Sequence, residues 1–143
     1  MYTNVLVPVD PAGGPIGARI IAVARLLAGE RGRITLLTVI PALPGHVRPH
    51  ISDEVIAESH AAAKAQLEAL AHGGGIDASA IIVREGGPGT VILDEADRLG
   101  ADAIVLGAHR PGFGDFLIGS TAARVVRHAQ CTVVVERSQP ESR

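Results

Sequence analysis

Five short apolar runs alternate along the chain with segments of helical period. The runs cover residues 4–9, 34–40, 81–83, 103–106 and 132–135, and Val, Ile and Leu dominate them. Nearly continuous apolar runs are typical of strands that are covered on both faces. The alternation therefore predicts a single α/β domain in which helices cover both faces of one doubly wound, five-stranded parallel sheet.

The segments between the runs carry apolar residues at helical spacing. Ser52 is predicted to cap the second helix, which has Val55 and Leu67 on its inner face and ends at the glycines of 73–75. The last helix is expected to turn Val125 and Val126 inward.

Proline and glycine mark the loops. Three prolines and a glycine in residues 41–50 predict a loop before the second helix. The sequence becomes polar after Arg137, so we expect a domain over residues 1–138 and a flexible tail over residues 139–143.

Composition narrows the class of protein. Apolar residues make up 47% of the 143 residues but aromatic residues only 2%, so the predicted core is aliphatic. The formal net charge of −2, without a basic stripe, argues against nucleic acid and anionic membrane as partners. Cys131 is the one cysteine, and no apolar run approaches the length of a membrane span. We therefore expect a cytoplasmic protein.

Candidate chemistry gathers where strands end, because an open parallel sheet binds ligands beyond the carboxyl ends of its strands. Residues 107–119 form a glycine-rich loop between a strand and a helix that begins near Gly119, Ser120 and Thr121. The free N–H groups of a helix start favour phosphate, to which Arg110 could add a charged contact. The alternative is that Ser120 or Thr121 is an ordinary helix cap.

The same strand ends carry a family resemblance over almost the whole chain. The matching segments are Val7-Pro8-Val9-Asp10, Leu37-Thr38-Val39-Ile40-Pro41, Glu85-Gly86, Gly107-Ala108-His109-Arg110-Pro111 and Gly119-Ser120-Thr121-Ala122-Ala123-Arg124-Val125-Val126-Arg127-His128-Ala129. In these segments the sequence resembles the universal stress protein family, in the branch that has a His-Arg-Pro loop. The resemblance implies strand order 3-2-1-4-5, a homodimer and, in many members, bound ATP.

The resemblance also implies a set of nucleotide contacts. Asp10 is expected near the ribose or a phosphate-bound Mg²⁺, and the backbone of Val39 is expected to meet adenine. Arg110 stands where the family has a second glycine, and the loop that follows is one residue shorter. We hypothesise that Arg110 replaces close backbone approach with a charge contact. The binding residues implied for ATP, ADP or AMP are Pro8, Val9, Asp10, Val39, Gly107, His109, Arg110, Gly119, Ser120 and Thr121.

Simpler interpretations of single residues stay open beside these. Asp10 could cap the turn before the first helix, and His109 could be a polar residue at a strand end, since no carboxylate or nucleophile is apparent to orient it as a base. His46 and His50 lack a third ligand at metal-site spacing. Cys131 is expected to be a small structural residue rather than a reactive thiol.

The family resemblance implies an ATP-binding regulator of the stress response that acts as a homodimer, and we expect an unidentified protein partner. The last strand, Thr132–Val135, would lie at a sheet edge, where an apolar strand invites pairing with a second copy. Two alternatives remain, a dimerisation module that needs no nucleotide and a slow Mg²⁺-dependent ATPase. No Walker-type glycine-lysine motif or kinase-like residue set supports fast catalysis.

Overall fold

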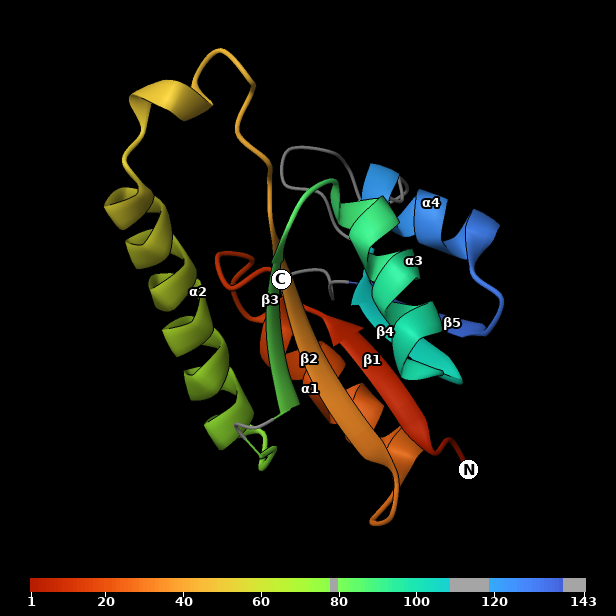
Figure 1. The fold of residues 1–143 in the computed structure, drawn as a ribbon. Coiled ribbons are helices and arrows are strands. Elements are labelled where there is room, and N and C mark those ends of the chain that lie inside the picture. The colour runs from red at the N-terminus through yellow and green to blue at the C-terminus, as the bar shows by residue number, and fades with distance from the viewer. Residues whose placement is uncertain (78–79, 109–118, 138–143) are drawn as a thin grey trace, which may run out of the picture.

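The strands form one parallel sheet in the order β3-β2-β1-β4-β5 (Figure 1). The computed structural model describes residues 1–77, 80–108 and 119–137. The strands are β1 (Asn4–Pro8), β2 (Arg33–Ile40), β3 (Ile81–Glu85), β4 (Ala103–Gly107) and β5 (Thr132–Glu136). The helices are α1 (Ile16–Ala28), α2 (Asp53–Gly73), α3 (Pro88–Leu99) and α4 (Ser120–His128), with a short 3₁₀ turn at Arg48–His50. The doubly wound architecture and the strand order are therefore confirmed.

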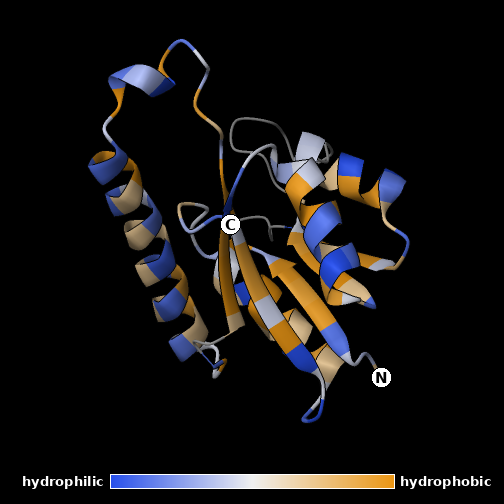
Figure 2. Cartoon of the chain, in the orientation of Figure 1, coloured by the Kyte–Doolittle hydropathy of each residue, from blue (hydrophilic) through white to orange (hydrophobic). Residues whose placement is uncertain are grey.

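The sheet separates two aliphatic cores, because side chains alternate between its faces. Val5 and Val7 of β1 pack toward α1 and α2, whereas Leu6 between them packs toward α3 and α4. All three side chains are fully buried. Figure 2 shows that the strands in the middle of the molecule are mostly apolar and that the helices carry polar residues on their outer faces.

Helix α2 differs from its predicted packing. Ser52 caps it as expected, since its hydroxyl accepts a hydrogen bond from the Val55 N–H at 3.2 Å. However, its buried residues are only Leu67 and Ala71, and Val55 is 52% exposed. In Figure 1 the chain between β2 and α2 and the first turns of α2 stand away from the sheet. The prediction that Val55 faces the core is therefore wrong.

Helix α4 also departs from the prediction at one position. Ala122 and Val125 are buried against the sheet, whereas Val126 is 50% exposed. Val126 lies about 100° around the helix axis from Val125, which turns it away from the face that Ala122 and Val125 bury. The predicted flexible tail at residues 139–143 lies outside the described residues.

A buried carboxylate fastens α3 to β3. Glu95 on α3 accepts hydrogen bonds from Arg84 Nε on β3 at 2.9 Å and from Arg98 Nε at 2.9 Å. Its side chain is only 9% exposed. Burial alone would raise the pKa of Glu95, but the hydrogen bonds from Arg98 and Arg84 outweigh it and hold the pKa below its ordinary value. Glu95 is therefore ionised at neutral pH and serves as a structural tie.

Asp102 closes the start of the central strand. Its carboxylate accepts hydrogen bonds from the backbone N–H groups of Thr3 at 2.8 Å and Asn4 at 2.9 Å, and from the Thr3 hydroxyl at 3.0 Å. The backbone bond from Thr3, followed by that from Asn4, lowers the pKa of Asp102 below its ordinary 3.8. The ionised carboxylate thus binds the amino end of β1 to the turn before β4.

We expect Asp102→Asn to destabilise the fold at neutral pH and to have a smaller effect in acid. A carboxyl whose pKa is lowered by folding stabilises the protein above its unfolded pKa, and this stabilisation is lost as pH falls through the folded pKa. Urea unfolding at several pH values measures the difference in the free energy of unfolding between the wild type and Asp102→Asn. That difference should shrink as pH falls below 3.8, whereas Glu68→Gln, on the exposed side of α2, should show little difference at any pH. A pH-independent difference for Asp102→Asn would contradict this role.

Candidate functional site

A cavity of about 400 Å³ opens at the carboxyl edge of the sheet, where β1, β2 and β4 end. Its walls come from these strand ends, from the turn after β1 and from the first turns of α1, α3 and α4. The predicted binding residues that line it are Pro8, Val9, Asp10, Val39, Gly107 and Thr121. The fold therefore brings residues from distant parts of the sequence to one hollow, at the place where a parallel sheet ordinarily binds ligands.

Asp10 holds a turn and still has a free carboxylate oxygen. One oxygen, Oδ1, accepts a hydrogen bond from the Ala12 N–H at 2.9 Å, and the Asp10 carbonyl accepts one from the Gly13 N–H at 2.9 Å. Because α1 begins only at Ile16, Asp10 closes the turn rather than capping the helix. Within the described part of the chain no group pairs with Oδ2, so this oxygen is available to a ligand.

Thr38 places a hydroxyl on the cavity wall. The residue is 4% exposed and lines the cavity between Leu37 and Val39 of β2. No hydrogen bond to its hydroxyl is made by any residue that the structure describes. Because Thr38 lines the cavity, a bound molecule can form a hydrogen bond with this hydroxyl. Thr38 lies in the segment Leu37–Pro41 that carries the family resemblance, but it was not among the predicted binding residues.

The start of α4 supplies N–H groups beside the cavity. The first hydrogen bond of the helix runs from the Ala123 N–H to the Gly119 carbonyl at 2.9 Å, and no side chain caps the helix. Among the described residues, the N–H groups of Ser120, Thr121 and Ala122 consequently have no acceptor. Thr121 lines the cavity, whereas Ser120 is exposed and Gly119 instead donates to the Ala108 carbonyl at 3.0 Å. This end of the helix favours an anionic group.

Gly107, at the end of β4, has no side chain, and this lets Ile16 of α1 pack close to it in the cavity. A Cβ atom there would lie 3.2 Å from Cγ1 of Ile16, which is tighter than most Cβ contacts, so the Ile16 side chain would have to shift slightly. The wall opposite is formed by Pro88 and Ile92 of α3, which were not predicted to line the site. The predicted contacts His109 and Arg110 lie outside the described residues, and their roles stay predictions.

The described residues form neither a metal site of their own nor a membrane-spanning helix. Among the described residues there is no group of three or more His, Cys, Asp or Glu side chains that could hold a metal ion by itself. No helix in the described ranges is long and apolar enough to cross a membrane. The cavity thus combines an apolar slot, one free carboxylate oxygen and a set of N–H donors, which suits a small molecule with an aromatic body and a phosphate.

We expect the Cys131 thiol to react slowly. Burial raises its pKa, and the carboxylates of Asp102 and Asp97 raise it further, so little thiolate is present at neutral pH. Titration with 5,5′-dithiobis(2-nitrobenzoate) should be much slower for the folded protein than for the protein in urea. Equal rates in the two conditions would show that the thiol is reactive in the folded state.

Comparison with known proteins agrees with the fold. The model of the universal stress protein family matches residues 1–137. Universal stress protein G of Escherichia coli O157:H7 is 32% identical over 142 residues, which cover 96% of this chain and 100% of the relative. The structure of universal stress protein UspA from Lactobacillus plantarum is 29% identical, with a TM-score of 0.75 over 95% of this chain and 98% of that one.

A more distant structure shares the fold. A universal stress protein from Archaeoglobus fulgidus is 24% identical and has a TM-score of 0.62, over 94% of this chain and 97% of that one. The family match spans nearly the whole chain and includes every strand of the sheet. This chain belongs to the universal stress protein family.

Proposed function

We propose that this protein binds an adenine nucleotide, ATP in particular, in the carboxyl-edge cavity and acts in the cytoplasm as a homodimeric regulator of the stress response. The observation that carries the proposal is the cavity itself. It brings together the hydroxyl of Thr38, Oδ2 of Asp10 and the N–H groups at the start of α4, which have no partner among the described residues. These groups come from three separate elements and point to one ligand.

Each part of the cavity suits one part of a nucleotide. The apolar walls at Val9, Val39 and Ile92 match the flat adenine ring. Asp10 Oδ2 can accept a hydrogen bond from a ribose hydroxyl. The start of α4 and Thr121 favour the phosphates.

Structures of related proteins with ligands support this assignment. The universal stress protein from Archaeoglobus fulgidus has been determined in complex with dAMP. Another universal stress protein, 21% identical with a TM-score of 0.63, has been determined in complex with cAMP. Both ligands contain adenine, which favours an adenine nucleotide over a guanine nucleotide for this chain.

The residues present also fit a magnesium ion bound through phosphates. Mg²⁺ usually combines one or two carboxylates with phosphate oxygens and water, and Asp10 has one carboxylate oxygen free for this purpose. Bound there, the ion would neutralise phosphate charge. The protein's own part is to hold the nucleotide and to place the Asp10 carboxylate beside it.

A thermal melt of nucleotide-stripped protein tests the proposal. A ligand at about 100 times its dissociation constant stabilises a fold by roughly 2.7 kcal/mol, which is a shift of several degrees for a domain of this size. We expect this shift with ATP and Mg²⁺ and a much smaller one with GTP. Because the chain lacks Trp, calorimetry or a dye reports the melt. Equal shifts with both nucleotides, or none, would overturn the proposal.

A dimerisation module that needs no nucleotide is the second candidate. The observation that favours it is the position of β5 at the edge of the sheet, with Val133, Val134 and Val135 only partly buried. An exposed apolar edge strand is stabilised when a second copy pairs with it. We therefore propose the homodimer contact at Thr132–Val135.

Sedimentation equilibrium checks the homodimer. We expect a particle of twice the chain mass of 14.7 kDa in the absence of nucleotide. Introducing a lysine by Val134→Lys should shift the equilibrium toward monomer, because two like charges would then meet at the strand pair. A monomeric wild-type protein at micromolar concentration would contradict the dimer.

A further inference from the structure

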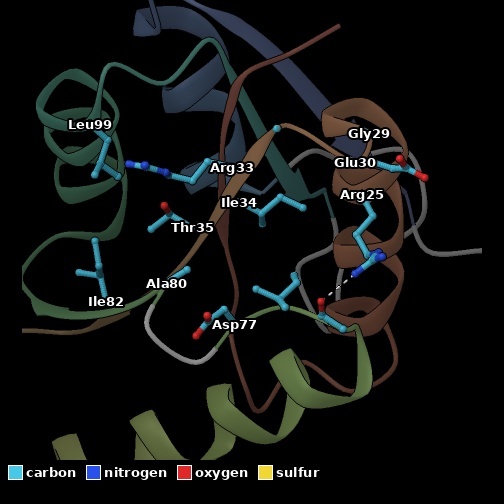
Figure 3. Close-up of a pocket in the computed structure, with 13 residues that line it drawn as sticks. Arg25, Gly29, Glu30, Arg33, Ile34, Thr35, Asp77, Ala80, Ile82 and Leu99 are labelled. Carbon is cyan, nitrogen blue, oxygen red and sulfur yellow. Dashed lines mark hydrogen bonds between the residues drawn. The ribbon is translucent and has the colours of Figure 1, made fainter.

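A second and larger cavity lies at the opposite end of the strands. Its volume is about 630 Å³, and it opens at the amino ends of β2 and β3, beside the end of α3 (Figure 3). One side of this amino-edge cavity is lined by Arg33 and Thr35 of β2, Ile82 of β3 and Leu99 of α3. The strand ends that form the carboxyl-edge cavity are not part of it.

Thr35 gives this cavity a hydroxyl group that has no hydrogen-bond partner among the described residues. The residue is 5% exposed, and no group in the described ranges makes a hydrogen bond with its hydroxyl. Figure 3 shows its oxygen directed to the side of the cavity where Arg33 lies. Because Thr35 lines the cavity, a bound molecule can form a hydrogen bond with this hydroxyl.

Arg33 adds a positive charge beside the apolar wall formed by Ile82 and Leu99. Its side chain extends toward Leu99 in Figure 3, and it has no ion-pair partner in the part of the chain that the structure describes. The carboxylate of Glu30 points away from it in the same view. The other arginine on the wall, Arg25, is already engaged, since its Nη1 donates to the carbonyls of Gly74 at 2.7 Å and Gly75 at 2.9 Å.

The charges around the cavity limit the ligand to a single negative charge. Among the described lining residues Arg33 is the cation left free, whereas the acidic residues Glu30 and Asp77 also line the cavity and disfavour a polyanion such as a triphosphate. The apolar wall of Ile82 and Leu99 requires a ligand with a hydrocarbon part. The volume lies within the range of about 300–1,000 Å³ that is usual for small-molecule sites.

From these observations we propose that the amino-edge cavity binds a small amphipathic monoanion, such as a medium-chain carboxylate. Its charged end would accept hydrogen bonds from the Arg33 guanidinium and the Thr35 hydroxyl, and its hydrocarbon part would lie against Ile82 and Leu99. The protein would then have two small-molecule sites at opposite ends of one sheet.

Octanoate serves as the probe, with ¹⁵N-labelled protein and backbone amide shifts as the readout. We expect octanoate to shift the amides of residues 33–35, 82 and 99 in a saturable way at millimolar concentration. Arg33→Gln should weaken octanoate binding about tenfold, because a hydrogen bond to a charged partner is lost. Thr35→Val keeps the shape of the side chain, and its loss of one hydrogen bond should weaken binding about fivefold.

Matched controls separate this site from general effects. Glu30→Gln, on the same cavity but directed away, should leave octanoate affinity unchanged within about twofold. Octanol, which lacks the charge, should bind more weakly, and Arg33→Gln should not change its affinity. Shifts confined to Asp10, Thr38 and Gly107 would place octanoate in the nucleotide cavity and overturn the proposal. Absence of saturable shifts at residues 33–35, or equal octanoate affinity in wild type and Arg33→Gln, would overturn it too.

Discussion

Leu6→Ala is expected to lower the free energy of unfolding by about 3 kcal/mol, a large loss for a single domain. Leu6 is fully buried in β1, the central strand, and packs among the side chains of α3, α4 and β4. Removing its branched end leaves a void that the sheet cannot close, because β1 is paired on both sides with β2 and β4. The melting temperature should fall by about 10 °C.

A matched leucine provides the control for this measurement. Leu26 lies on α1 and is 84% exposed, so Leu26→Ala should change stability by no more than about 0.5 kcal/mol. Both variants are compared with the wild type by urea unfolding at one pH. Equal losses for Leu6→Ala and Leu26→Ala would contradict the placement of the core.

The central fold could be predicted from the sequence because strand and helix signals alternate without a break. Each strand is apolar since helices cover both faces, and the right-handed connection of parallel strands leaves few topologies. The exact strand order, however, was implied by the family resemblance in residues such as Val7–Asp10 and Gly119–Ala129, and the hydrophobic pattern alone does not give it.

The packing of α2 could not be predicted because this helix is longer than the strand beside it. A helix of 21 residues is about 30 Å long, whereas the five residues of its neighbour β3 span about 17 Å. The apolar spacing of Val55, Leu67 and Leu70 indicates which face is apolar, but it does not tell where the sheet ends. Leu67 is fully buried, whereas Val55 is half exposed, and the first turns of α2 stand away from the sheet in Figure 1.

Asp10→Ala is expected to weaken the binding of ATP with Mg²⁺ by about tenfold or more. This change removes the free carboxylate oxygen that faces the cavity, and a hydrogen bond or ion contact to a charged group is worth about 1.5–3 kcal/mol. Calorimetric titration of the nucleotide-stripped protein measures the affinity. An unchanged affinity for Asp10→Ala would show that Asp10 serves the turn alone.

Asp10→Asn separates the charge from the turn. The Asn side chain keeps an oxygen that can accept the hydrogen bond from the Ala12 N–H, so the loop after β1 should be preserved. We expect Asp10→Asn to lose most of the contribution of Mg²⁺ to ATP affinity while its melting temperature without ligand stays close to that of the wild type. If Asp10→Asn instead melted at a lower temperature and bound ATP with Mg²⁺ as tightly as the wild type, Asp10 would serve the turn and not the ligand.

The candidate site was partly accessible from the sequence. Asp10, Val39 and Gly107 lie at or just beyond strand ends, where parallel sheets bind ligands, and the family resemblance implied their contacts with a nucleotide. Pro88 and Ile92 were missed because their exposure to the cavity depends on how α3 packs against β2. Thr38 lies on the opposite face of β2, and the family resemblance implied a contact for Val39 beside it but not for Thr38. The amino-edge cavity was also missed, since Arg33, Ile82 and Leu99 meet only after β2 pairs with β3 and α3 covers them.

The most direct test of nucleotide binding maps ATP onto the protein by backbone amide shifts. We predict that ATP with Mg²⁺ shifts the amides of residues 9–10, 38–39, 107 and 121, which line the carboxyl-edge cavity, while those of residues 33–35 at the other end of the sheet stay in place. Shifts of this pattern would establish the nucleotide site. No shift at the carboxyl edge with ATP at millimolar concentration would contradict nucleotide binding there and leave the dimerisation module as the better description.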